Sequence, residues 1–284
     1  MIKFVSYLLV LVILIGGGAA YSESINLSYD VFSQGKSIGS FKQEVIFTEN
    51  GRQYIQVWSL SVKGWWGKYE LKELNFETYD ETLGLQSAIS KSYENQQANW
   101  IELIREDNGE LRHSHQSTKK MNRRERERLA FLSEQVGEIG LGDIERFRTE
   151  FDEIYARYGK PRVIADFYYS GSIVTSTRLP EQLLSKYRRQ ASTEDGNMGE
   201  VTIYDNEIMK LQSHKVEFTG LVRALLHGNI VTAHSFSLKR PDHPAASIWV
   251  ARHPNDNFPY MLRYTGVDSD GEFHILLDGL NKIQ

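Results

Sequence analysis

The sequence predicts a mainly β protein (β with α insertions): a curved antiparallel sheet, or open half-barrel, with a few helices packed in or over its concave side. Aromatic residues are abundant, with 15 Tyr, 13 Phe and 5 Trp against only 6 Pro, and such side chains are enriched in strands. Long stretches alternate apolar and polar residues, which is typical of half-buried strands. Because a curved sheet must cover its apolar inner face, we expect helices or a ligand there.

Residues 25–116 have the period-two alternation of an antiparallel meander. The Asn50-Gly51 pair predicts a two-residue hairpin turn because both residue types tolerate positive φ. The Asn108-Gly109 pair predicts a second hairpin for the same reason. The strands predicted in this part lie at about 27–32, 41–48, 54–62, 69–79, 85–93, 100–105 and 110–116.

A helical insertion is predicted at about 119–190, with a short strand at 163–169 and a short helix at 180–189 that has Pro180 near its first turn. Asp143 is a plausible N-cap for a further helix over 143–158. That helix carries one apolar face, made by Ile144, Phe147, Phe151, Ile154, Tyr155 and Tyr158. The face predicts either a helix packed against the sheet or a docking surface for a partner protein.

Residues 199–283 return to the alternation of strands, and the last predicted turn lies at 268–271. No strict repeat or low-complexity linker divides the chain, so residues 23–284 are expected to form a single β-rich domain. The strands predicted in this part lie at 200–204, 211–218, 230–238, 247–252, 260–265 and 272–277.

Residues 1–22 predict a signal peptide. One lysine precedes an apolar run over 4–15 and a stretch of small residues, which is the order of a secretory signal. The run is too short for the ~20 residues of a membrane-spanning helix. We expect cleavage after Ala20 or Ser22 and a periplasmic or secreted protein. The alternative is an inner-membrane protein anchored through the uncleaved segment.

The composition excludes several function classes. The formal net charge of −4 does not suggest nucleic acid as a partner. The absence of Cys excludes disulfides and thiolate metal sites. His113 and His115 share a strand face but lack an identifiable third ligand, so no metal or cofactor is predicted. Because no nucleophile elbow, phosphate-binding loop or zinc-protease motif is present, no catalytic residue is assigned.

The tryptophans are the candidate ligand-binding residues. Trp65 and Trp66 stand between two glycines, and consecutive strand positions point to opposite faces. One ring can lie in the core, and the other is then exposed or in a cleft, where tryptophan is favoured. The complete predicted set is Trp58, Trp65, Trp66, Trp100 and Trp249.

Several short motifs together resemble an uncharacterised family of exported bacterial envelope proteins, a domain of unknown function. The opening motif is 27–32 with 35–39, and the middle block is 174–177 with 195–199. The closing block consists of 233–236, 247–250, 262–264 and 270–271. The resemblance implies export and a β-rich fold, and it carries no activity or catalytic residues to transfer.

The sequence thus predicts a non-enzymatic envelope protein that binds or carries an apolar or amphiphilic ligand such as a lipid. Aromatic-rich alternation and the absence of a catalytic motif support this interpretation. Two alternatives stay open: an assembly adaptor that binds an envelope protein partner, and a hydrolase without a recognisable motif. The oligomeric state is not predicted.

Overall fold

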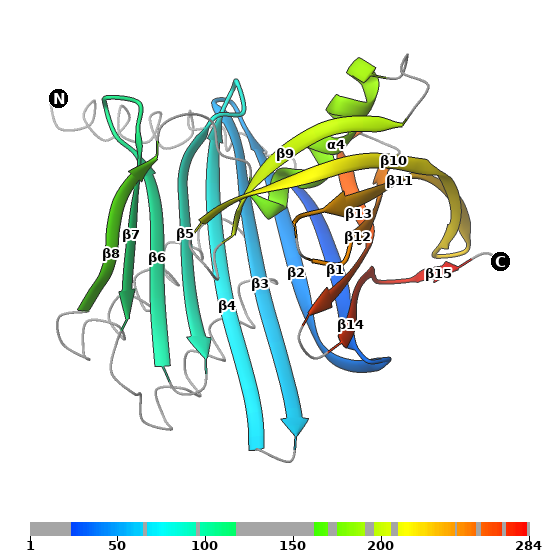
Figure 1. Cartoon of the computed structure of the whole chain (residues 1–284), viewed down its shortest axis with the longest axis horizontal. Coiled ribbons are helices and arrows are strands. Elements are labelled where there is room, and N and C mark those ends of the chain that lie inside the picture. Colours follow the sequence, from blue (N-terminus) through cyan, green and yellow to red (C-terminus); the bar gives the residue numbers. More distant parts are fainter. Residues whose placement is uncertain are drawn as a thin grey trace, which may run out of the picture.

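The computed structural model describes residues 24–64, 67–94, 97–117, 162–169, 175–190, 196–205, 210–241, 243–253, 257–268 and 271–282. The predicted fold class is confirmed. The described strands form one antiparallel sheet in the order β15-β10-β11-β12-β13-β14-β1-β2-β3-β4-β5-β6-β7-β8, and β9 also pairs with β10. Since this path runs from one edge strand to another, the sheet of the described residues is open (Figure 1).

The predicted meander is present as the first half of the sheet, in which each strand pairs with the next. Its strands are β1 (Ser24–Ser33), β2 (Lys36–Thr48), β3 (Gly51–Gly64), β4 (Gly67–Asp80), β5 (Leu85–Glu94), β6 (Gln97–Arg105), β7 (Leu111–Ser117) and β8 (Arg162–Tyr169).

The second half begins with two helical elements, the short 3-10 helix η2 (Ser176–Arg178) and helix α4 (Leu179–Gln190). Helix α4 is the helix that the sequence predicts at 180–189. The strands that follow are β9 (Asn197–Asp205), β10 (Lys210–Leu226), β11 (Asn229–Lys239), β12 (Ala246–Arg252), β13 (Pro259–Asp268), β14 (Gly271–Leu277) and β15 (Leu280–Lys282).

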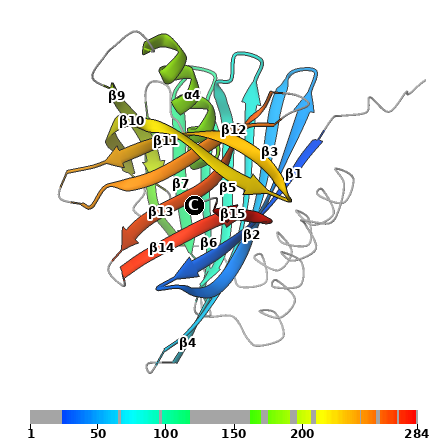
Figure 2. The same ribbon diagram turned by 90° about the vertical axis from the view of Figure 1, so that its right-hand side faces the viewer.

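The sheet curves back over itself, so that β10–β14 lie in front of β3–β7 in Figure 2. Side chains from the two halves meet in a shared core. Phe258, before β13, lies 5.8 Å from the Phe47 ring, and the rings of His113 and Tyr204 are 5.9 Å apart. The curvature therefore brings side chains of the first half of the sheet into contact with side chains of the second half.

A second core lies beneath α4. Leu183 and Leu184 of the helix are buried together with Phe236 and Val250 of the sheet. The alternate residues on these strands, such as Ala251, belong to the shared core instead. Strands β11 and β12 are therefore covered on both faces, and the apolar face of α4 packs against the sheet.

One turn differs in detail from the prediction. Thr48 pairs with Gly51, so the two loop residues of the β2–β3 hairpin are Glu49 and Asn50 rather than Asn50 and Gly51. Gly51 is the first residue of β3, with φ 139°, and a Cβ there would lie 1.9 Å from the Tyr79 carbonyl oxygen. Glycine is needed at this position for the close approach of β4.

Strand β10 is longer than predicted, and β15 was not predicted. The alternation that marks 211–218 is interrupted at Gly220, where the pairing with β11 shifts by one residue. A bulge of this kind breaks the period of two without ending the strand. Strand β10 therefore continues to Leu226, and its last residues pair with the three-residue β15.

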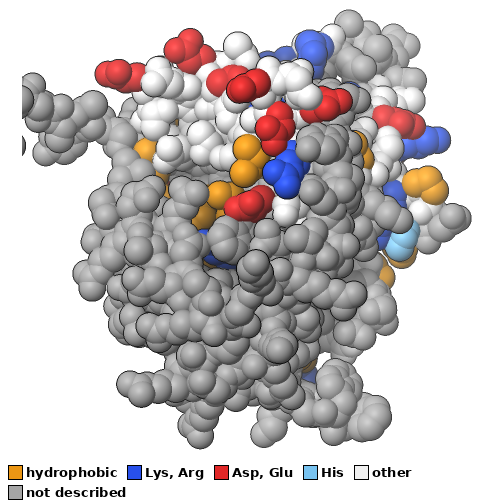
Figure 3. Space-filling model, turned by 90° about the vertical axis from the view of Figure 1, so that its left-hand side faces the viewer, with side chains coloured by type: hydrophobic (Ala, Val, Ile, Leu, Met, Phe, Trp, Pro, Cys, Tyr) orange, Lys and Arg blue, Asp and Glu red, His pale blue; other side chains and the backbone are white. Residues whose placement is uncertain are grey.

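Some predictions fall outside the described residues, namely the signal peptide at 1–22 and the helix at 143–158. The single domain over 23–284 also stays a prediction. None of the described helices has the length and apolar character needed to cross a membrane. On the face shown in Figure 3, the described acidic and basic side chains are interspersed.

The core beneath α4 can be tested by Phe236→Ala, since the Phe236 side chain is completely buried. We expect a loss of about 3–5 kcal/mol in the free energy of unfolding, because a cavity remains where the ring was. Leu221→Ala is the control: this side chain is 61% exposed, so a change within about 0.5 kcal/mol is expected. Urea unfolding followed by circular dichroism measures both, and equal losses would contradict this account of the core.

Candidate functional site: an arginine-lined pocket

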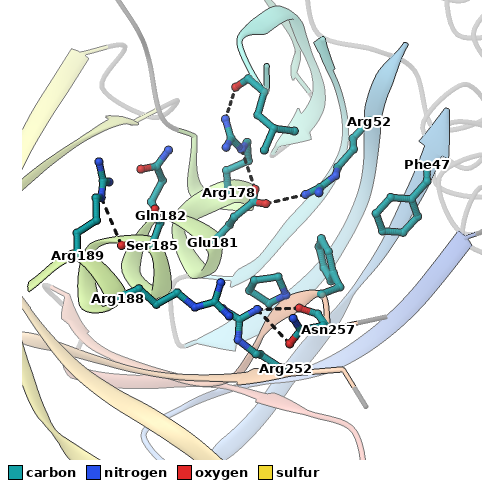
Figure 4. A pocket seen from close by; sticks show the side chains of 13 residues that line it. Phe47, Arg52, Arg178, Glu181, Gln182, Ser185, Arg188, Arg189, Arg252 and Asn257 are labelled. Atoms are coloured by element: carbon teal, nitrogen blue, oxygen red, sulfur yellow. Dashed lines mark hydrogen bonds and ion pairs between the residues drawn. The ribbon is translucent and has the colours of Figure 1, made fainter. Parts of the chain in front are cut away.

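A pocket of about 710 Å³ opens at the end of the sheet where α4 meets the turns of both halves. Its walls come from the β2–β3 hairpin, the β4–β5 turn, η2, α4 and the segment between β12 and β13. Among the described residues, one carboxylate lines it, that of Glu181. Five arginines line it (Figure 4), namely Arg52, Arg178, Arg188, Arg189 and Arg252.

The helical period places the polar side of α4 on this pocket. Leu183 and Leu184 face the core, and Pro180 in the first turn costs no helical hydrogen bond. Glu181, Ser185 and Arg188 follow one another at the four- and three-residue spacing of one helical face. Burial of the leucines thus decides which side chains of α4 reach the pocket.

Glu181 joins two arginines from distant parts of the chain. Arg52 Nη1 donates to Glu181 Oε1 at 2.7 Å, and Arg178 Nε donates to Oε2 at 3.2 Å. Each carboxylate oxygen therefore has one guanidinium partner. Burial alone would lower the pKa of Arg52, but the charge and hydrogen bond of Glu181 outweigh it and the pKa is raised.

Two further contacts hold the guanidinium of Arg178 in place. Its guanidinium lies 4.9 Å from the centre of the Tyr79 ring and donates to the backbone carbonyl of Leu83. The β4–β5 turn presents that carbonyl because Asp80 Oδ1 accepts hydrogen bonds from the backbone N–H groups of Thr82 and Gly84, both at 2.9 Å. The β4–β5 turn thus takes part in the site.

Arg188 and Arg252 form a second pair of arginines, and their guanidinium groups converge in Figure 4. Arg252 Nη1 donates to the carbonyl and side-chain oxygens of Asn257, at 2.9 and 3.2 Å. Asn257 has φ 59°, a conformation that asparagine tolerates better than most residues. The pKa of Arg252 is lowered, first by burial and then by the positive charge of Arg188.

Apolar side chains line the same pocket. The Arg52 guanidinium lies 5.3 Å from the ring centre of Phe47 and 5.8 Å from that of Phe258. Pro259 and Leu83 complete the apolar lining. The pocket therefore combines concentrated positive charge with aromatic surface.

A buried carboxylate anchors η2 to the sheet beneath the pocket. Glu77 Oε2 accepts hydrogen bonds from the hydroxyls of Tyr79 at 2.8 Å, Thr175 at 2.7 Å and Thr177. Burial raises the pKa of Glu77, while these hydrogen bonds and the charge of Arg178 act in the opposite direction. The Glu77 hydroxyl cluster (Glu77, Tyr79, Thr175 and Thr177) holds Arg178 at the start of α4.

Trp58 and Trp249, the two predicted tryptophans whose side chains the structure describes, do not line this pocket. Trp58 on β3 is half-buried and stacks on Phe41 at 4.3 Å between ring centres. Trp249 on β12 is half-buried beneath the guanidinium of Arg263, at 5.1 Å. Trp65 and Trp66 lie outside the described residues, and for Trp100 on β6 the side chain is not described. The predicted binding role of the five tryptophans stays a prediction.

The two strand histidines lie on β7, where His113 is buried and His115 is half-buried. Burial lowers the pKa of His115. Within the described part of the chain, no group of three or more metal-ligating side chains is found.

No family model matches the chain, and no curated protein matches it. Among solved structures, it is similar to the crystal structure of a beta-barrel-like protein of a domain of unknown function, DUF1849, from Brucella abortus. The likeness covers 92% of this chain and 97% of that chain, with a TM-score of 0.49 and 10% sequence identity. That protein, like the family that the sequence resembles, is a domain of unknown function.

The Glu77 hydroxyl cluster predicts a pH-dependent effect of Glu77→Gln. Because burial raises the pKa of Glu77, the folded protein binds this proton more tightly than the unfolded chain does. Wild-type stability at this group is therefore greatest below the unfolded pKa and falls as pH rises through the folded pKa. The variant Glu77→Gln has no titrating group at this position. We therefore expect the Tm of the variant minus the Tm of wild type to rise from about pH 5 to about pH 8.

Thermal unfolding across this pH range measures that difference, and a constant difference would contradict the prediction. Glu77→Ala is the companion variant. It leaves the three hydroxyls without their shared acceptor, so we expect a lower Tm at every pH, with about 1–3 kcal/mol lost per unsatisfied group.

Proposed function

We propose that this chain is an exported cell-envelope protein that binds or carries an amphiphilic anion without changing it chemically. The observation that carries the proposal is the concentration of five arginines against one carboxylate around a single pocket. The formal charge of the described lining is 5 − 1 = +4, in a chain whose overall formal charge is −4. Local charge of the opposite sign to the whole molecule favours a specific anion site over general attraction.

The arginines also differ in what they do. Arg52 and Arg178 share the single negative charge of Glu181, and these ion pairs hold α4 against the sheet. Arg188 and Arg252 face each other without a carboxylate from the described residues between them. A ligand with a negative headgroup would relieve their repulsion, and arginine forks suit carboxylate and phosphate groups.

The apolar lining supports an amphiphile rather than a small inorganic ion. Phe47, Phe258 and Pro259 present hydrocarbon surface within the same pocket as the arginines. Burying the first carbons of an alkyl chain against such surface stabilises binding by about 0.8 kcal/mol per CH₂ group. The predicted ligand class, apolar or amphiphilic, is thereby narrowed to an anionic amphiphile.

The same lining favours binding over catalysis. General acid–base chemistry needs a proton donor or acceptor that is available to a substrate. In the described lining, the single carboxylate is bonded through both oxygens to arginines, and no histidine is present. These groups can hold and orient an anion.

Binding can be measured by isothermal titration calorimetry with octyl phosphate, whose chain is short enough to stay monomeric. We expect Arg188→Gln and Arg252→Gln each to weaken binding about tenfold or more, since charge-assisted hydrogen bonds are worth about 1.5–3 kcal/mol. Lys36→Ala is the control, because Lys36 begins β2 and the pocket lies at its other end, ~40 Å away. Equal loss in all three variants, or no binding by wild type, would contradict the proposed pocket.

Export rests on the N-terminal segment. The order of one lysine, a short apolar run and small residues supports cleavage and a periplasmic or secreted location. Expression of the full chain in a bacterium followed by N-terminal sequencing should yield Tyr21 or Glu23 as the first residue in the periplasmic fraction. An intact Met1 in the membrane pellet would instead support the anchored alternative.

A further inference from the structure

We infer that the Arg188–Arg252 pair selects a doubly charged headgroup, so that the ligand belongs to the phosphate monoesters rather than to the carboxylates or sulfate esters. The inference rests on the proposed function and narrows it to one chemical class. It follows from the hydrogen-bond donors, the charge and the shape that the pair offers to a ligand.

Within the described residues, several N–H donors of this pair are left for a ligand. Both described hydrogen bonds of Arg252 to Asn257 leave from Nη1, so Nε and Nη2 are not engaged by a described residue. None of the described side chains forms a hydrogen bond or ion pair with the guanidinium of Arg188, which converges on Arg252 in Figure 4. Each guanidinium can therefore present N–H donors to a ligand in the pocket that both side chains line.

The charge of the pair calls for two negative charges. Glu181 is the one described carboxylate of the pocket, and both of its oxygens already bind Arg52 and Arg178. Arg188 is exposed and Arg252 is half-buried, and a monoanion between them would leave one of their two positive charges uncompensated. A dianion balances both charges, and a phosphate monoester carries about −1.5 to −2 at pH 7.

The number of hydrogen-bond donors in the pair also favours a phosphate monoester over a carboxylate. The N–H donors of two arginines need more acceptor positions than the two oxygens of a carboxylate. A phosphate monoester has three terminal oxygens on one atom, and so does a sulfate ester. The sulfate ester has only one negative charge, so a comparison of the two esters separates charge from shape.

The test compares octyl phosphate, octyl sulfate and nonanoate by calorimetry on the full mature chain at about pH 7.5, where the phosphate ester is mainly dianionic. We expect octyl phosphate to bind about tenfold or more tightly than either monoanion. Arg188→Gln should reduce this ratio to about threefold or less. Lys36→Ala should leave the ratio unchanged.

Dependence on pH provides a second readout. From about pH 5 to about pH 7.5, affinity for octyl phosphate should rise about tenfold, because the second phosphate pKa is near 6. Among the described residues, the charged and titratable groups around the pair are Glu181, Arg52, Arg178, Arg189, Tyr54 and His234. Burial lowers the pKa of His234, followed by the charge of Arg252. Octyl sulfate does not titrate in this range, so it reports any change that comes from the protein groups.

The outcomes separate the two proposals. Equal binding of octyl phosphate and octyl sulfate, lost together in Arg188→Gln, would overturn dianion selection and leave the anionic amphiphile site standing. Failure of all three ligands to bind would overturn the proposed function. Inorganic phosphate that binds as tightly as octyl phosphate would support selection of the dianion and would show that the alkyl chain contributes nothing, against an amphiphilic ligand.

Discussion

The ion pairs of Glu181 are the interaction on which the pocket depends. Arg52 and Glu181 are separated by 129 positions in the chain, and their 2.7 Å contact ties the β2–β3 hairpin to α4. The second oxygen of the same carboxylate binds Arg178 at the end of η2. Because each side chain here is mostly shielded from water, breaking one partner would leave a charge that is expensive to bury. Beneath these ion pairs, the Glu77 carboxylate accepts hydrogen bonds from neutral hydroxyl groups. Two carboxylates, Glu77 and Glu181, therefore hold η2 in place.

These contacts are possible because the sheet is curved. Arg52 lies on β3 and Arg252 at the end of β12, which are far apart in the strand order. Curvature brings the β2–β3 hairpin, the β4–β5 turn and the β12–β13 segment to one end of the molecule, where α4 lies across them (Figure 1). A flat sheet with the same pairing would separate these residues by many strand spacings of about 4.8 Å each. The pocket is thus a property of the fold as a whole and of none of its strands alone.

That dependence explains what could be predicted from the sequence. Alternation, turn residues and the proline at the start of α4 are local signals, and they were sufficient for nearly all strands and for the helix. The predictions failed in detail at two glycines. A bulge at Gly220 interrupts the alternation, so the continuation of β10 was missed. Glycine is needed at Gly51 for the close approach of β4, which no local pattern predicts. The arginines of the pocket gave no local signal, since they come from distant segments. The tryptophans were predicted from the Trp65-Trp66 pair and from the preference of tryptophan for clefts. The described rings of Trp58 and Trp249 contact Phe41 and Arg263 and do not line the pocket.

Arg188 and Arg252 are pocket arginines that have no carboxylate partner among the described residues. By contrast, Glu181 binds both Arg52 and Arg178, and three hydroxyls bind Glu77. Here burial and then the charge of Arg188 lower the pKa of Arg252, and Asn257 offers only neutral oxygens. The two like charges repel each other, and water screens part of this repulsion because Arg188 is exposed. Burial of Leu183 and Leu184 holds the helix that carries Arg188, and the hydrogen bonds to Asn257 hold Arg252. The proposed anion would relieve the repulsion between these two arginines, so the packing of α4 would contribute to the proposed affinity by keeping Arg188 in place.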